Sequence, residues 1–346
     1  MRRYTALLLT AFTLLLLTAA GSAYLAGADR TERHEPMQEF TAYTTLPPEH
    51  AALLSDAYEQ TSHVRVNFVP LSPDETLHRL RNGDERWEKD LSLLLADREV
   101  LQKAASESLL QPYISEKNDA VHSSFKDENG LWTGVWYDPI VFCVNRDYMK
   151  TLTAIPDSWA ELAGHSDARI GLTDFLAADA AANLMFQMIG QFGDTATYQI
   201  LRDLHPRVVQ YAKYLSNPVR QAGMGEVDIS IAVESETLRY IQEGYPIQIV
   251  YPADGTAWLL TGTAIPATAS GSSEKAAEDF SNWLLSDEAQ IALQSRGFYF
   301  LPTNPDTLAY KSFAGKNILL FQQLLSFTPE QKHSFLDRWV KYIRLK

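Results

Sequence analysis

Apolar segments with a strand pattern alternate with helical segments after residue 40, and this alternation constrains the fold most. Val64, Val66 and Phe68 alternate with polar residues as in a half-buried strand, and residues 91–95 form a continuous apolar segment. Helical spacing follows Pro47-Pro48 and again precedes Gly83, residues typical of helix starts and ends. The order strand, helix, strand, helix, strand predicts a parallel sheet with right-handed crossovers.

The pattern starts again after the acidic turn at residues 126–130. From Ser273 onward it is mainly helical, and no internal repeat interrupts it. Between these points the strand-like segments are residues 135–145, 170–173, 229–233 and 247–251. A second α/β unit therefore follows the first.

The junctions between the two units, near Trp136 and near Gly262, fall within or beside strand-like segments rather than flexible linkers. Units joined by strands hinge against each other. We expect two lobes, residues 38–136 with about 262–310 and residues 137–261 with about 311–346.

The N-terminus has the parts of a secretory signal peptide. Arg2 and Arg3 precede a mostly apolar run without charge until Asp29, and small residues close it. We expect residues 1–28 to be a cleaved signal and residues 29–37 a disordered leader. The alternative is an uncleaved membrane anchor, since 25 uncharged residues could cross a bilayer. Either case places the folded part in the periplasm or outside the cell.

Composition and motifs exclude several classes of function. The net charge of −13 argues against nucleic acid as a partner. Cys143, the only cysteine, lies in an apolar segment and cannot form an internal disulfide. No zinc, calcium, nucleotide-loop or nucleophile-elbow motif occurs, so we expect no metal, no cofactor and no catalytic residue.

The stretch "NWLLSDEAQ" at residues 282–290 raises the question of whether its acids do chemistry. Ser286 stands where a helix N-cap belongs, and Asp287 and Glu288 fall in the first turn, where the helix dipole favours negative charge. These residues therefore predict a boundary between two helices.

This segment also resembles a known family. "FSNWLLSDEAQIAL" is similar to the C-terminal signature of bacterial extracellular solute-binding proteins of ABC importers, the group that binds ferric iron, thiamine, polyamines, phosphonates and sugar phosphates. Five further segments resemble the family in order and spacing: "FTAYTTLPPEH", "DLSLLLADREVLQKAASESLLQPY", "IPDSWAEL", "GEVDISIAVESETLRYIQEGYPIQIVYPADGT" and "GFYFLPTNP". Together they cover about residues 38 to 305.

The resemblance implies a type II periplasmic-binding-protein fold, in which each lobe is a mainly parallel sheet flanked by helices and crossover strands join the lobes. It implies a small-molecule ligand in the cleft, a membrane permease of an ABC importer as partner, and no catalysis. We expect a monomer. Two alternatives stay open: a ligand-sensing subunit for a membrane histidine kinase, and a secreted hydrolase.

In the first lobe, cleft contacts are expected at loops after strand ends. Thr44 and Thr45 match the family's contact loop, and ordinary turn capping is the alternative. Asp97 follows a predicted strand and suits an N-cap as well as a ligand contact. Tyr137, beside the junction, could stack on a ligand or pack in the core.

In the second lobe, the candidates are Asp174, Ser216 and Glu234, each after a strand-like or turn segment. The ferric binders hold iron with adjacent tyrosines, whereas this chain has Glu234-Ser235-Glu236 at that position, so the resemblance does not extend to that tyrosine site. Metal binding assisted by carboxylates stays open as an alternative. A charge at a helix N-terminus is the alternative role of Glu234. The acids favour a cationic or polyhydroxylated ligand, or else an anion held by backbone N–H groups and Arg98 or Arg220.

Overall fold

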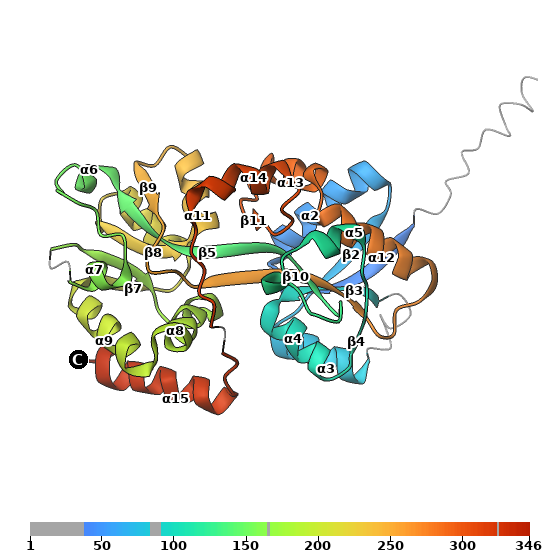
Figure 1. The fold of residues 1–346 in the computed structure, drawn as a ribbon, viewed down its shortest axis with the longest axis horizontal. Coiled ribbons are helices and arrows are strands. Elements are labelled where there is room, and N and C mark those ends of the chain that lie inside the picture. Colours follow the sequence, from blue (N-terminus) through green and yellow to red (C-terminus); the bar gives the residue numbers. More distant parts are fainter. Residues whose placement is uncertain (1–37, 84–90, 165–166, 324) are drawn as a thin grey trace, which may run out of the picture. The chain divides into compact units, whose positions relative to one another are not determined.

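Two long antiparallel strands, β5 (Thr133–Asn145) and β10 (Trp258–Pro266), run through the middle of the fold (Figure 1). We call them the connecting strands. The structure, a computed structural model, describes residues 38–83, 91–164, 167–323 and 325–346. The predicted signal peptide and leader lie outside the described residues. Within the described part of the chain, no helix combines the length and apolar character needed to span a bilayer.

The first lobe is built on parallel strands. β1 pairs with β2 and with β3, and β3 pairs antiparallel with β10. The short strands β4 and β11 add to β10 and β5. Its elements are β1 (Glu39–Thr44), α2 (Pro48–Ser62), β2 (Arg65–Pro70), α3 (Pro73–Asn82), β3 (Leu91–Asp97), α4 (Arg98–Ser106), β4 (Leu110–Gln111), α5 (Glu116–Ala120), η1 (Ser123–Phe125), α12 (Gly271–Leu284), α13 (Asp287–Gln294), β11 (Leu301–Pro302), α14 (Leu308–Phe313) and η3 (Ala314–Lys316).

The second lobe continues the same sheet, whose strand order is β2-β1-β3-β10-β5-β8-β6-β7. β8, β6 and β7 are parallel, and β5 pairs antiparallel with both β8 and β9. Its elements are α6 (Arg146–Met149), α7 (Trp159–Gly164), β6 (Ile170–Thr173), α8 (Asp179–Phe192), α9 (Asp194–Leu204), η2 (His205–Arg207), β7 (Val208–Ala212), α10 (Ser216–Gly223), β8 (Ile229–Val233), α11 (Glu234–Gln242), β9 (Ile247–Val250), α15 (Pro329–Trp339) and η4 (Val340–Arg344).

The connecting strands approach closely because glycines face each other across them. Gly262 pairs with Gly134 next to a register shift in β10. A Cβ atom on Gly262 would lie 2.6 Å from the carbonyl oxygen of Thr133, and one on Gly134 would lie 2.7 Å from the carbonyl oxygen of Phe125. Only glycine avoids these clashes, as expected where two backbones meet at a strand irregularity.

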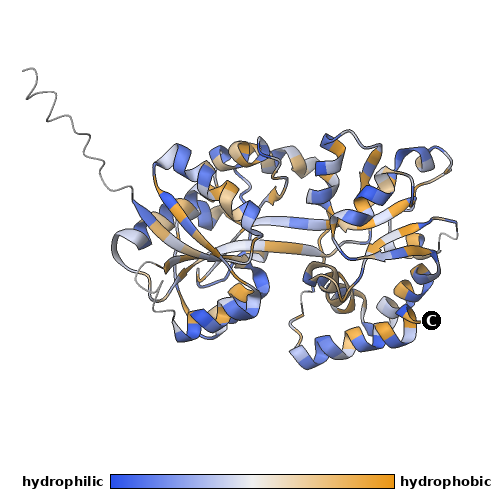
Figure 2. Cartoon of the chain, turned by 180° about the vertical axis from the view of Figure 1, so that it is seen from behind, coloured by the Kyte–Doolittle hydropathy of each residue, from blue (hydrophilic) through white to orange (hydrophobic). Residues whose placement is uncertain are grey.

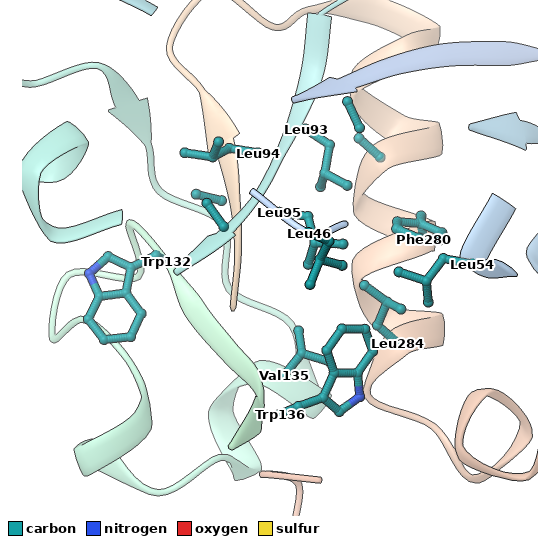
Figure 3. Packing of buried hydrophobic residues seen from close by; sticks show 14 of the residues in the cluster. Leu46, Leu54, Leu93, Leu94, Leu95, Trp132, Val135, Trp136, Phe280 and Leu284 are labelled. Carbon is teal, nitrogen blue, oxygen red and sulfur yellow. The ribbon is translucent and has the colours of Figure 1, made fainter. Parts of the chain in front are cut away.

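Each lobe has its own hydrophobic core. Apolar residues concentrate on the strands, and the helices carry alternating hydrophilic and hydrophobic stripes (Figure 2). In the first lobe, α12 places Phe280 and Leu284 near Leu54 and Leu46 (Figure 3). In the second lobe, Trp339 of α15 packs on Phe175 and Tyr211, with ring centroids 4.8 and 5.5 Å apart. The C-terminal helix therefore belongs to the second core.

The predicted boundary at Ser286 is confirmed. Its hydroxyl accepts a hydrogen bond from the N–H of Ala289, and Asp287 and Glu288 occupy the first turn of α13. Asp97 holds the N-cap position of α4, as predicted, although its side chain makes no capping hydrogen bond.

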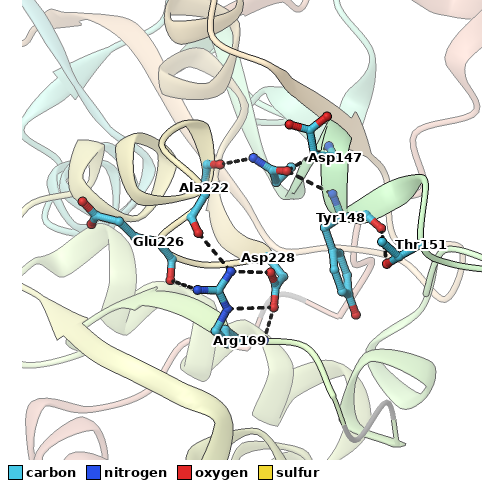
Figure 4. Close-up of polar contacts among 9 residues, drawn as sticks. Asp147, Tyr148, Thr151, Arg169, Ala222, Glu226 and Asp228 are labelled. Atoms are coloured by element: carbon cyan, nitrogen blue, oxygen red, sulfur yellow. Dashed lines mark hydrogen bonds and ion pairs between the residues drawn. The ribbon is translucent and has the colours of Figure 1, made fainter.

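A polar clamp ties the start of β6 to the start of β8 (Figure 4). The backbone N–H and Nε of Arg169 both donate to one carboxylate oxygen of Asp228, at 2.7 and 3.2 Å, and its Nη2 donates to the other at 2.7 Å. The guanidinium also donates to the carbonyl oxygens of Glu226 and Gly225. The carboxylate therefore satisfies a backbone donor and a cation together.

Replacing Asp228 by alanine is expected to lower the free energy of unfolding by about 1–3 kcal/mol, because the backbone N–H and the guanidinium of Arg169 lose the charged acceptor that the buried carboxylate provides. Urea unfolding followed by circular dichroism measures the loss. Asp147→Ala is the control, since its ion pair with Lys150 is exposed on both sides and should contribute less than about 0.5 kcal/mol. Equal losses in the two variants would contradict the assigned role of the clamp.

Candidate functional site

A cavity of about 1240 Å³ lies between helices of the two lobes. The first lobe contributes α3 and α4, the second contributes α8 and the start of α15, and β10 lines it between them. In Figure 1 these four helices lie on the lower side of the connecting strands. The volume exceeds the ~300–1,000 Å³ of most small-molecule pockets, as expected of a cleft that is open to solvent.

Helix N-termini surround this cavity. Ser72 caps α3, and Thr328 and Gln331 form a capping box on α15. Among the described residues, no side chain caps α4 or α8, whose N-cap residues are Asp97 and Ala178. First-turn N–H groups without a cap are available to ligand acceptors.

Trp258 forms a fixed surface in the cavity wall. Its backbone N–H donates to Gln187 of α8 at 3.0 Å, and its carbonyl accepts from the same side chain at 2.7 Å. The indole N–H donates to the carbonyl oxygen of Phe321 at 3.1 Å. Arg98 lies over this ring, with Cζ 3.7 Å from the ring centroid. The indole of the connecting strand β10 therefore positions a cation at the start of α4.

Three acids, Asp97, Glu99 and Asp179, line the cavity at the starts of α4 and α8. Protein atoms around Asp97 desolvate its carboxyl and raise its pKa to about 6, and the charges of Glu99 and Asp179 act in the same direction. A hydrogen bond with Thr45 opposes this shift. A carboxyl group with a pKa near 6 can either accept or donate a hydrogen bond close to neutral pH.

Of the seven residues expected at the ligand, Asp97 lines the cavity. Thr45 lies beside Asp97: its hydroxyl accepts a hydrogen bond from the backbone N–H of Asp97 at 3.1 Å. Thr44 is buried, and its hydroxyl accepts the N–H of Leu46. The loop after β1 thus touches the site through Thr45.

Tyr137 lies within the connecting strand β5 and Glu234 at the start of α11, and neither is among the described residues that line the cavity. Tyr137 stacks on Phe125 with ring centroids 5.1 Å apart. Glu234, the first residue of α11, is buried and accepts a hydrogen bond from the hydroxyl of Tyr251. Burial raises its pKa to about 7.

Asp174 and Ser216 also lie apart from the cavity lining. Asp174 accepts from the N–H of Leu176 at 2.9 Å and pairs with Arg344 at 3.3 Å, so it joins the C-terminal helical region to the loop after β6. Ser216 is the half-buried first residue of α10. A ligand-binding role for these residues stays a prediction.

Sequence reasoning missed several residues of the cavity wall, among them Trp258 and Lys332. It also missed Asn183 and Gln187, for which a signal existed. They lie four residues apart in the otherwise largely apolar helix α8, so both project from the same face. Polar residues along one face of an otherwise apolar helix indicate that this face borders a solvent-filled cavity.

Comparison with known proteins places the chain in a family. The family described as bacterial extracellular solute-binding protein matches residues 54–318. The chain belongs to this family. An uncharacterised protein of Haemophilus influenzae is 24% identical over 257 residues, which cover 70% of this chain and 73% of the relative.

Solved structures of periplasmic binding proteins share the fold. AfuA of Actinobacillus pleuropneumoniae, with fructose-6-phosphate bound, has a TM-score of 0.68 at 20% identity and covers 89% of this chain and 99% of its own. Iron-bound HitA of Pseudomonas aeruginosa has a TM-score of 0.67 at 17% identity, with coverage of 87% and 98%. The predicted two-lobe α/β fold of a type II periplasmic binding protein is confirmed.

The iron-bound neighbour raises the question of a metal. In the part of the chain that the structure describes, no three His, Cys, Asp or Glu side chains are grouped so that they could hold a metal ion. The position after β8 carries Glu234 and Ser235, and Ser235 donates to Asp138 through both its N–H and its hydroxyl.

Proposed function

We propose that the protein captures a small solute in the cavity between its lobes, outside the cytoplasm, and delivers it to the membrane permease of an ABC importer. Membership of the solute-binding family supports this proposal. The observation that carries it is the cavity itself, because residues of both lobes line it and two strands connect those lobes.

A solute in this cavity changes the balance between open and closed forms. Asp97 and Arg98 come from the first lobe, and Asn183 and Gln187 come from the second. A ligand that contacts both sets favours the closed form by the free energy of its additional contacts there. Closure around an unchanged solute requires no catalytic group, so we propose no enzymatic activity.

A thermal-shift screen of the chain from Asp29 tests the proposal. The panel contains ferric citrate, spermidine, thiamine, phosphonates, hexose phosphates and free sugars. A ligand at one hundred times its dissociation constant should stabilise the fold by about 2.7 kcal/mol. We expect one chemical class to respond, and small-angle scattering should then show a smaller radius of gyration.

Two results would count against this proposal. One is the absence of any response across the panel. The other is consumption of the responding compound, measured by mass spectrometry after incubation, which would indicate the secreted hydrolase instead.

A further inference from the structure

Arg98 lies over an aromatic ring in the wall of the cavity. Its guanidinium carbon Cζ lies 3.7 Å from the centroid of the Trp258 ring. The backbone of Trp258 exchanges two hydrogen bonds with the Gln187 side chain, and the indole N–H donates to the carbonyl oxygen of Phe321. An arginine stacked on a ring keeps the edge of its planar fork free for hydrogen bonds. This fork is therefore oriented before any ligand arrives.

Arg98 differs from the other cations of the cavity because it lacks an acidic partner. Arg81 and Lys103 both pair with Glu107, at 2.5 and 3.2 Å, and Lys332 pairs with Glu99 at 2.5 Å. Throughout the described part of the chain, no carboxylate lies within ion-pair distance of Arg98, and none of its N–H groups donates a hydrogen bond. Its positive charge therefore remains uncompensated by direct contact.

Because Arg98 is partly removed from water, the lack of an acidic partner makes its charged form less stable. Desolvation lowers the pKa of Arg98 to about 10, against a smaller opposing effect of Glu99. The group still carries its full charge at neutral pH. A charge that is taken partly out of water is stabilised most by an opposite charge with bidentate hydrogen bonds.

The surroundings of Arg98 fit an anion that also carries hydroxyl groups. The uncapped first turns of α4 and α8 border the same cavity and offer backbone N–H groups. Asp97 and Asp179 would repel a bare anion, but they can accept hydrogen bonds from hydroxyls attached to it.

We infer that the captured solute carries a carboxylate or phosphate group bound by the fork of Arg98, with its hydroxyls on Asp97 and Asp179. This inference rests on the proposed function, since it names the class of solute for the same cavity.

Isothermal titration calorimetry tests it with matched pairs of probes. Fructose 6-phosphate is compared with fructose, and citrate, inorganic phosphate and spermidine complete the set. The protein is the chain from Asp29, freed of bound solute by partial unfolding and dialysis. We expect an anionic probe to bind, and fructose to bind at least tenfold more weakly than its phosphate.

Three variants separate the role of Arg98 from general effects of charge. Arg98→Gln should weaken binding of the anionic probe at least tenfold, which corresponds to about 1.4 kcal/mol. Arg98→Lys keeps the charge without the fork and should recover only part of the affinity. Arg202→Gln is the control, because Arg202 is exposed on α9 outside the cavity lining, and it should leave the affinity within twofold. Circular dichroism verifies that each variant is folded.

The possible failures are distinguishable. Binding of fructose or spermidine without any anionic probe would overturn this inference and leave the proposed function standing. Anion binding that Arg98→Gln and Arg202→Gln weaken equally would also overturn it. No heat from any probe, together with no response in the thermal-shift panel, would overturn both the inference and the proposed function.

Discussion

Replacement of Phe280 by alanine is expected to lower the free energy of unfolding by about 3–5 kcal/mol, because it leaves a cavity in the core of the first lobe. Phe280 is fully buried on α12. Its ring lies 4.8 Å from Tyr58, 5.7 Å from Trp283 and 5.9 Å from Phe40, measured between centroids. These rings come from β1, α2 and α12, so the cavity would loosen the covering of the sheet.

Urea denaturation measures the effect of Phe280→Ala, and two further variants provide its scale. Phe280→Leu keeps most of the volume and should cost clearly less. Ile291→Ala removes a side chain that is 65% exposed and should change stability by less than about 0.5 kcal/mol. A loss below about 1 kcal/mol for Phe280→Ala would show that the core can rearrange around the missing ring.

Replacement of Glu234 by glutamine is expected to change how stability depends on pH. Glu234 is 1% exposed. One of its carboxylate oxygens accepts from Tyr251, and the other has no hydrogen-bond partner among the residues that the structure describes. Desolvation raises the pKa of Glu234 from its ordinary 4.5 to about 7, while the hydrogen bond from Tyr251 and the charge of Lys316 oppose the shift.

The sign of this pH dependence follows from the number of protons bound in the folded and in the unfolded state. Between pH 4.5 and 7 the folded protein keeps a proton on Glu234 that the unfolded chain has released. Stability from this group is therefore present at low pH and is lost as the pH rises to 7 and above. Glutamine does not titrate, so Glu234→Gln should gain about 2 kcal/mol relative to wild type between pH 5 and pH 8.

Chemical denaturation at a series of pH values measures this gain. Asp138 lies nearby, and burial raises its pKa to about 7 as well, with Glu234 and Glu236 contributing. It is present in both proteins, so its effect largely cancels. Glu49→Gln changes an exposed glutamate in the first turn of α2 and should follow the wild-type profile. If the stability of Glu234→Gln and of wild type changed with pH in the same way, the raised pKa of Glu234 in the folded protein would be contradicted.

The sequence predicted the elements whose signals are local. The strands at residues 170–173 and 229–233 have the predicted bounds, and the strand at 247–251 ends one residue early, at Val250. Ser286 caps its helix as predicted. Hydrophobic periodicity and capping depend on neighbours along the chain, so they can be read without tertiary information.

The candidate site was predicted less completely. Reasoning from strand ends identified Asp97, which lines the cavity, and Thr45 beside it. It also pointed to Glu234, whose burial under Tyr251 depends on the packing of α11 against the end of β9. No local pattern reports how deeply a side chain is covered by a distant segment.

The sequence by itself determined the alternation of strands and helices and the likeness to a solute-binding family. Only the tertiary structure decided which side chains share the cavity. Arg98 and Trp258 are 160 positions apart in the numbering, and they meet because β10 returns from the second lobe to pair with β3 beside the start of α4. Such a contact depends on strand pairing between remote segments, for which the chain carries no local signal.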